Sequence, residues 1–187
     1  MCGRSEIYLR GDHNLLNVLA ATAIAAVAGI EMPAIRHTIQ SFRGVEHRQE
    51  LVREINGAKF YNDSIATSPE RTLAAVRAFD PPIILIVGGK SKHLAVDALA
   101  EAIVRKVRYV IAMGEFGEEL VCAIRALPDG QALPITQCDS LASAVAQAAD
   151  ISRPGDSVVL SPGGTSFDWF RDFEDRGQQF KALVNAL

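Results

Sequence analysis

The residues from 62 to 68 carry amide, carboxyl and hydroxyl side chains directly after an apolar, β-prone run at 58–61. A helical pattern follows at once, because Ser68 suits an N-cap and Pro69 suits the first helical position. The polar groups are therefore expected at the carboxyl end of a strand and beside a helix N-terminus, where α/β proteins bind ligands and anions are favoured. An ordinary polar loop with a helix cap is the alternative interpretation.

Two further loops have the same placement. Residues 88–92 contain two glycines and two lysines after the apolar run 83–87, and residues 161–168 contain glycines and hydroxyl groups after the run 157–160. Lysines can hold a carboxylate or phosphate, and backbone N–H groups of a glycine-rich loop can bind an anion. The loop at 88–92 contains Gly89-Lys90-Ser91, which resembles the end of a phosphate-binding P-loop. The full pattern needs a glycine at the position of Ile84, so we reject it.

Apolar β runs alternate with helical patterns along most of the chain. This order predicts an α/β fold with a Rossmann-like, mostly parallel sheet and flanking helices, in which the three polar loops lie at one edge. Asn-Gly at 56–57 predicts a tight hairpin turn. We expect strands at 50–55, 58–61, 83–87, 109–113, 134–136 and 157–160, and helices at 69–79, 96–105, 118–126, 141–149 and after residue 168.

The first part of the chain has a different pattern. Alternation at 6–10 predicts a strand, and helices are expected at 15–28 and 33–42. This strand has no preceding partner, so we expect residues 1–44 to be the end of one domain and residues 45–187 to form a second domain. Asn14 is either an N-cap or an amide able to recognise a base such as adenine.

A charged segment at 43–50 contains one glycine and is assigned to the domain boundary. It is either a solvated hinge or part of a site. In the second case, Arg48 would hold a phosphate or ribose, and His47 would contact a metal ion or its water.

Composition excludes several classes. The chain has 187 residues, 49% of them hydrophobic, and a net charge of -3. Spread charges of this size argue against a nucleic-acid or membrane-binding surface. The three cysteines are far apart and indicate thiols in a reducing compartment, so we expect a cytoplasmic protein. The first residues lack an apolar signal-peptide core, and the run 15–30 is too short for a transmembrane helix.

The motifs of this chain resemble, in order, those of the Mur ligase family. The resemblance covers nearly the whole chain, and the Asn-Asp-Ser-x-Ala-Thr form of the central loop is similar to that of members that add D-glutamate. The motifs that carry the resemblance are Gly11-Asp12-His13-Asn14 with Asn17, Glu46-His47-Arg48-Gln49-Glu50, residues 62–69, the GGxxK loop at 88–92, residues 161–168 and Phe173-Glu174-Asp175-Arg176-Gly177.

The resemblance implies an ATP-dependent, amide-forming ligase of peptidoglycan assembly. ATP would phosphorylate the carboxylate of UDP-N-acetylmuramoyl-L-alanine, and D-glutamate would attack the acyl phosphate with its amine. Mg2+ would neutralise charge on the phosphates. We expect a cytoplasmic monomer without nucleic-acid or membrane partners, acting in cell wall formation and thereby in cell shape and division.

The resemblance also implies roles by motif position. Asn14 and Asn17 would lie on the adenine side, Arg48 and Asp63 would contact nucleotide and ribose, and His47 would lie near Mg2+.

The amino-acid pocket would be formed by Thr67, Lys92, Ser166, Phe167 and Phe173. In this role Lys92 would pair with a glutamate carboxylate, while Ser166 and nearby backbone N–H groups would bind one too. Closure about residues 44–46 would bring these groups to the acyl phosphate.

Two departures from the family pattern are visible. Ile65 stands where relatives can carry a lysine, and the sequence contains no GxxxxGK(S/T) loop. We therefore expect a chain that corresponds to the end of the central ATPase domain plus the C-terminal domain, inactive by itself and with no certain catalytic residue. A glutamate ligase with another acceptor, similar to folylpolyglutamate synthetase, and a non-catalytic α/β binding module are the alternatives.

Overall fold

The computed structural model describes residues 2–187, which divide into two compact units that are treated separately below. Unit 1 ends at Val45 and unit 2 comprises Glu46–Leu187. Among the described residues, no helix combines the length and apolar content that crossing a membrane would need. The assignment of unit 1 to the end of an ATP-binding domain stays a prediction.

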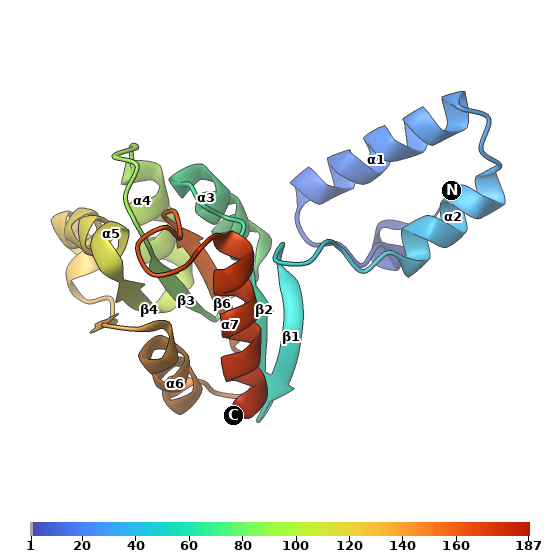
Figure 1. The fold of residues 1–187 in the computed structure, drawn as a ribbon. Helices are drawn as coiled ribbons and strands as arrows, with labels where there is room; N and C mark the ends of the chain where they lie inside the picture. Colours follow the sequence, from blue (N-terminus) through green and yellow to red (C-terminus); the bar gives the residue numbers. More distant parts are fainter. Residues whose placement is uncertain (1) are drawn as a thin grey trace. The chain divides into compact units, whose positions relative to one another are not determined.

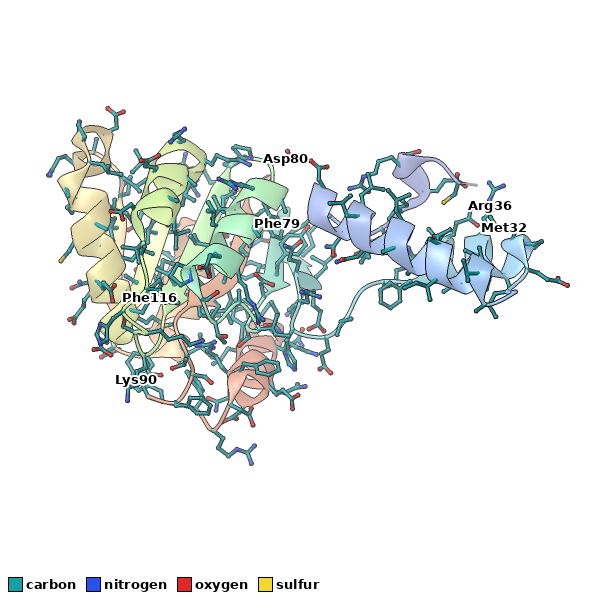
Figure 2. The ribbon with its side chains drawn as sticks, turned by 90° about the horizontal axis from the view of Figure 1, so that it is seen from above. Met32, Arg36, Phe79, Asp80, Lys90 and Phe116 are labelled. Atoms are coloured by element: carbon teal, nitrogen blue, oxygen red, sulfur yellow. The ribbon has the colours of Figure 1, made fainter. Side chains whose placement is uncertain are left out.

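Unit 1 contains the short 3-10 helix η1 (Arg4–Glu6), the helix α1 (Asp12–Val27) and the helix α2 (Met32–Ser41). Both long helices begin earlier than predicted. The strand expected at 6–10 is wrong: residues 7–10 are irregular, because no neighbouring strand among the described residues pairs with them. Glu6 instead pairs with Arg36, a residue of α2 labelled in Figure 2, over 3.0 Å.

Unit 2 is built on one sheet of six strands, as predicted (Figure 1). The strand order is β1-β2-β6-β3-β4-β5, with β1 antiparallel to β2 and the remaining pairs parallel. β6 therefore lies between β2 and β3, which places the change of strand order at this point of the sheet. The strands are β1 (Glu50–Ile55), β2 (Ala58–Asn62), β3 (Ile83–Gly88), β4 (Val107–Met113), β5 (Ile135–Cys138) and β6 (Ser157–Gly163).

The hairpin between β1 and β2 forms as its turn residues predict. Asn56 and Gly57 have φ angles of 50° and 81°, which the tight I′ turn requires at both positions. Asn tolerates this left-handed region better than most residues, and glycine has no steric penalty there.

Helices cover both faces of the sheet, and alternate strand residues supply two cores. On one face α3, α4 and α5 pack on a cluster that includes Leu85 and Val159; on the other, α6 and α7 pack on a cluster that includes Ile84 and Val158. The confirmed α/β class follows from this double coverage. The helices are α3 (Pro69–Ala78), α4 (Asp97–Lys106), α5 (Gly114–Ala126), α6 (Leu141–Ile151) and α7 (Phe173–Ala186), and a 3-10 helix η2 (Pro128–Gln131) follows α5.

Two boundaries and one helix cap differ from the prediction in ways that matter for the site. β6 continues through Gly163, and α5 starts directly at Gly114, whose φ of 58° lets the chain turn from strand to helix. Ser68 occupies the N-cap of α3 as predicted, but its hydroxyl bonds Glu70 over 3.1 Å rather than capping the backbone.

The start of β6 is held by a buried ion pair. Asp156 is 2% exposed and accepts hydrogen bonds from Arg108 at 2.5 and 3.3 Å and from the Arg153 N–H at 2.8 Å. We expect Asp156→Ala to lower the free energy of unfolding by about 3 kcal/mol, because it removes the carboxylate partner of a partly buried guanidinium and the acceptor of the Arg153 N–H. Urea unfolding at neutral pH measures this loss.

The exposed pair Arg105–Glu101, 2.6 Å apart, is the matched control. Glu101→Ala should change stability by no more than about 0.5 kcal/mol. Equal losses in the two variants would contradict the assignment of Asp156 as a buried anchor.

Candidate functional site

Three loops at the carboxyl ends of parallel strands are fastened to one another. The Gly163 N–H donates to Ala66 O over 2.8 Å, and Lys90 and Thr165 exchange backbone hydrogen bonds of 2.9 Å in both directions. These bonds join the loops predicted to form the site into one continuous rim. We call them the β2 loop (62–68), the β3 loop (88–92) and the β6 loop (161–168).

Arg176, near the start of α7, donates hydrogen bonds to the β2 loop and to the β6 loop. It is 1% exposed; its Nη2 donates to Ser64 O over 2.9 Å, its Nε to Ser64 Oγ over 3.0 Å, and its Nη1 to Gly164 O over 3.3 Å. Burial lowers the pKa of Arg176 to about 10, and the charge of Asp168 opposes this shift. The guanidinium is therefore still protonated at neutral pH, and it brings a positive charge beneath the rim.

A second polar network centres on Asn62, at the end of β2. The Ser64 N–H donates to Asn62 Oδ1 over 3.1 Å, which fixes the orientation of the amide, and Asn62 Nδ2 then donates to His47 Nδ1 over 2.9 Å. Since His47 Nδ1 accepts this bond, the ring proton of the neutral imidazole lies on Nε2. Asn62 is fully buried, so the network is part of the interior rather than a solvent-exposed feature.

The same segment contains a cluster with the residue types of a metal site. Glu46, His47 and Glu50 bring candidate ligand atoms within 4.8 Å of one another. The Nζ of Lys181, however, lies 2.7 Å from Glu46 Oε1 and 2.9 Å from Glu50 Oε1, so one ammonium group already pairs with both carboxylates and offsets part of their charge. Hydrogen bonds from Lys181 and then Gln178 hold the pKa of Glu46 below its ordinary value.

These contacts do not fit a Mg2+ site made by the cluster itself. The carboxylates have a cationic partner, and the one lone pair of His47 that a metal needs is engaged by Asn62. The expectation that His47 lies near Mg2+ stays a prediction, in which its Nε2–H would donate to a water molecule.

Gly177 gives His47 the space it occupies. A Cβ at Gly177 would lie 2.1 Å from His47 Nδ1, and the ring also meets Phe173 edge-on with centroids 6.1 Å apart. His47 itself has a φ of 63°, which is strained for a residue with a side chain. The close approach of helix and ring therefore requires glycine at 177, although the helix would favour alanine.

Asp63 lies between the two networks with both oxygens engaged. Its Oδ1 accepts from the Gln49 N–H over 3.1 Å, and its Oδ2 accepts from Ser161 Oγ over 2.9 Å. Burial raises the pKa of Asp63 to about 7, against the lowering effect of these hydrogen bonds and of Arg48 and Arg71. In the part of the chain that the structure describes, the side-chain Oε1 of Gln49 is buried without a hydrogen-bond partner.

The residues predicted for the amino-acid pocket all lie on the rim or beside it. Ser166 is 2% exposed, Thr67 and Phe173 are half-buried, Lys92 is exposed, and Phe167 is 71% exposed. A hydrogen bond of 2.8 Å from Ser64 Oγ to Phe173 O holds the start of α7 against the β2 loop. The structure thus brings together the loops carrying Thr67, Lys92 and Ser166, while the ring of Phe167 points into solvent.

The residues predicted for the nucleotide are divided between the units. In unit 1, Asn14 is 7% exposed and donates from Nδ2 to Arg10 O over 2.8 Å, while Asn17 is exposed and lines an apolar groove of about 360 Å³ between α1 and α2. The N-cap interpretation of Asn14 is wrong, because α1 begins at Asp12 and Asn14 lies in its first turn. In unit 2, Arg48 is exposed.

A positively charged side chain lies beside Ile65, the position at which relatives can carry a lysine. Arg71 Nη1 donates to Ile65 O over 3.0 Å, and the charge of Arg71 acts on Asp63. A positive charge is therefore present at the β2 loop without a lysine at position 65.

Sequence reasoning missed the residues that hold the rim together. The sequence identifies Arg176 and Gly177 only as members of a motif, and it indicates no role for Ser161. A charged residue in a helix ordinarily indicates a solvated face. The available signal was the Arg-Gly pair placed one turn into a helix that follows a glycine-rich loop.

The fold is that of an α/β domain of the doubly wound type, with three joined loops at the carboxyl ends of its strands. Residues 47–164, more than half of the chain, match the family model described as Mur ligase, glutamate ligase domain. The chain therefore belongs to the Mur ligase family.

Individual relatives show to which members of the family the chain is similar. It is 44% identical over 187 residues to UDP-N-acetylmuramoylalanine–D-glutamate ligase of Acetivibrio thermocellus, covering 98% of this chain and 40% of that protein. The ligase of the same name from Symbiobacterium thermophilum is 46% identical over 182 residues, covering 97% of this chain and 40% of that protein. The chain thus spans about 40% of the length of these relatives.

Solved structures agree on the fold. The UDP-N-acetylmuramate–alanine ligase of Thermotoga maritima has a TM-score of 0.71 at 14% identity, covering 96% of this chain and 39% of that one. A folylpolyglutamate synthase of Mycobacterium tuberculosis complexed with ADP has a TM-score of 0.65 at 18% identity, covering 95% of this chain and 41% of that one. At such identities the likeness shows the shared fold alone.

Because α7 packs closely against His47, replacing the helical glycine at 177 by alanine is predicted to destabilise the fold, which is the opposite of the effect that helix propensity alone would give. Gly177→Ala should lower the free energy of unfolding by about 2 kcal/mol, because the added methyl displaces the His47 ring from a packed, hydrogen-bonded position. Ala182→Gly on the same helix should also lower it, by about 1 kcal/mol, through helix propensity. Alanine is thus worse than glycine at 177 and better at 182; urea unfolding that showed Gly177→Ala to be stabilising would contradict this packing.

The buried carboxyl group predicts a pH dependence. Asp63 has an ordinary pKa of 3.8 and a pKa of about 7 in the fold. Between these values the folded protein retains a proton that the unfolded chain has lost, so this group makes the fold less stable as pH rises through the window and adds no further change above it. Relative to Asp63→Asn, the wild type should lose at most about 1.4 kcal/mol per pH unit in this range.

Urea unfolding of both proteins across the window measures the difference. Parallel pH profiles for the wild type and Asp63→Asn would show that the carboxyl group titrates normally in the fold.

Proposed function

We propose that this chain supplies the amino-acid-binding part of an ATP-dependent ligase that adds D-glutamate to UDP-N-acetylmuramoyl-L-alanine in peptidoglycan assembly. The observation that carries the proposal is the single rim formed by the three loops above buried Arg176, in a chain 42–46% identical to relatives of that name. The cytoplasm is the proposed location, and a monomer the proposed state.

The rim suits a substrate with two carboxylates. Lys92 supplies an ammonium group on the β3 loop, and the buried Arg176 adds a fixed positive charge. Lys92 would pair with one carboxylate of D-glutamate, and Ser166 with neighbouring backbone N–H groups would bind the other. Thr67 would add a hydroxyl contact from the β2 loop.

The aromatic residues have different proposed roles. Phe173 is half-buried at the start of α7 and would cover the aliphatic part of the amino acid. Phe167 would contact the substrate only after turning from its exposed position.

The nucleotide side is proposed from the resemblance and from polarity. Asn14 and Asn17 would contact adenine, while Arg48 and Asp63 would contact phosphate and ribose. Asp63 has acceptor capacity beyond the two hydrogen bonds it receives, which is what a ribose hydroxyl requires.

The reaction needs an activated carboxyl group, since a carboxylate is a poor electrophile. A carboxylate oxygen of the acceptor attacks the γ-phosphorus of ATP, and ADP leaves. The D-glutamate nitrogen then attacks the acyl carbon; the C–O bond to phosphate breaks, and the nitrogen loses a proton. In this proposal the chain's own residues orient the amine, which is the contribution that proximity makes to such a step. Mg2+ is expected from the resemblance alone, and we derive no step through it.

A hybrid enzyme tests the proposal. In it, residues 1–187 replace the matching segment of the Acetivibrio thermocellus ligase. The hybrid should release phosphate only with D-glutamate, ATP and UDP-N-acetylmuramoyl-L-alanine present. Lys92→Ala and Ser166→Ala should each raise the KM for D-glutamate about tenfold or more while the KM for ATP changes less than about twofold.

Lys90→Ala is the matched control, because Lys90 is exposed and joins the rim through its backbone. The 187-residue chain alone should be inactive. Unchanged KM values in both site variants would support a non-catalytic binding module instead, and activity only with a folate acceptor would support the other alternative.

A further inference from the structure

Lys92 lies in a segment without regular structure. Residues 91–96, between β3 and α4, form neither helix nor strand, and the ammonium group of Lys92 has no ion-pair or hydrogen-bond partner among the described residues. A long, exposed lysine can reach many positions, so its usefulness in a site depends on how firmly its backbone is held. On the N-terminal side, the bonds of Lys90 to Thr165 provide that hold.

The other contacts come from Ser91, which α5 holds by two carboxylates. The Ser91 N–H donates to Glu115 Oε2 over 3.2 Å, and Ser91 Oγ donates to Glu119 Oε2 in a short hydrogen bond. Ser91 Oγ in turn accepts from the His93 N–H over 2.9 Å. Ser91 is 8% exposed, so its bonds are protected from competing water.

The position of α5 allows both contacts. Glu115 and Glu119 are four residues apart and therefore lie on one face of the helix. The helix starts immediately after β4 at Gly114, and the Phe116 N–H donates to Gly89 O over 2.8 Å, so its first turn is fixed against the β3 loop. Lys90 and Phe116, labelled in Figure 2, mark these two adjoining segments.

The backbone around Lys92 is held in an unfavourable shape. His93 has a φ of 52°, a region that residues with side chains seldom adopt. The His93 N–H donates to Ser91 Oγ, and this hydrogen bond joins the two residues that flank Lys92 into one tight turn. The turn therefore combines a local hydrogen bond of Ser91 with the two contacts that α5 makes to the same serine.

We propose that Ser91, Glu115 and Glu119 are positioning residues that orient Lys92 toward a carboxylate of the bound amino acid. This inference rests on the proposed function, because it needs Lys92 to bind the substrate. We call the three residues the α5 clamp. Each carboxylate accepts one hydrogen bond from Ser91, so the serine is held both at its N–H and at its Oγ.

Amide hydrogen exchange on the 187-residue chain tests the clamp without any assumption about activity. Glu119→Ala should speed exchange of the His93 amide about tenfold or more, because Ser91 Oγ loses the partner that fixes it. Glu119→Gln retains a carbonyl acceptor and should leave exchange near the wild-type rate. Glu118→Ala, on the exposed side of the same turn, is the control. Unchanged exchange in Glu119→Ala would overturn the proposal.

Kinetics in the hybrid ligase test the effect on substrate. Glu119→Ala should raise the KM for D-glutamate about fivefold, with kcat and the KM for ATP within about twofold, and Glu119→Gln should restore the KM. In a Lys92→Ala background, Glu119→Ala should have no further effect, since the residue that it positions is gone. A purely structural role would give the same fold-change in both backgrounds and would overturn the proposal.

The two measurements separate failure of the inference from failure of the proposed function. A wild-type hybrid that folds but shows no D-glutamate dependence would overturn the proposed function and, with it, the role of the clamp in substrate binding. A D-glutamate-dependent hybrid in which Glu119→Ala frees the His93 amide but leaves the KM unchanged would overturn the inference alone.

Discussion

The candidate site depends on the burial of one guanidinium group. Arg176 is 1% exposed, and its bonds go to two carbonyl groups and a hydroxyl group rather than to a carboxylate. A buried cation is tolerated only where its donors are satisfied, so the β2 and β6 loops must present their oxygens toward it. Glycine at 89 is part of the same constraint, since a Cβ there would lie 3.1 Å from Arg176 Nη1 and 2.2 Å from Thr165 O. The glycines of the rim therefore provide close packing as well as flexible backbone.

The distribution of charge around Arg176 explains why the rim suits an anion. Asp168 is the acidic residue whose charge acts on the guanidinium, and no ion pair neutralises Arg176 among the described residues. Glu46 and Glu50 have the cation Lys181 as their partner, while Glu115 and Glu119 accept hydrogen bonds from Ser91 and keep their charges. A carboxylate ligand at the rim would thus meet the positive charge of Arg176, and the interaction would be favoured where water is partly excluded.

Local patterns predicted the parts of the fold whose causes are local. Buried parallel strands have continuous apolar runs such as 83–87, and Asn56-Gly57 sets its turn by its own backbone preferences. The predicted strand at 6–10 failed because pairing depends on a neighbour that a single sequence does not reveal. Likewise, Ser64 and Arg176 are 112 positions apart, and the contacts between them leave no periodic signal. The loops were therefore predictable as a group, whereas the residues that fasten them were not.

The polar networks also limit where the chain between the two units can bend. Glu46 is bonded to Gln178 and Lys181, and the Ile65 N–H donates to His47 O over 3.2 Å, so the backbone from Glu46 onward belongs to unit 2. Gly44 has a φ of 106° and precedes these bonds. The hinge expected at 44–46 stays a prediction; bending after Glu46 would break the contacts of His47 with Asn62 and of Glu50 with Lys181, which favours a hinge in the residues before Glu46. Bending before Glu46 would therefore leave the positions of His47 and Asp63 within unit 2 unchanged. If these residues bind a nucleotide, the nucleotide must bind at their fixed position in unit 2.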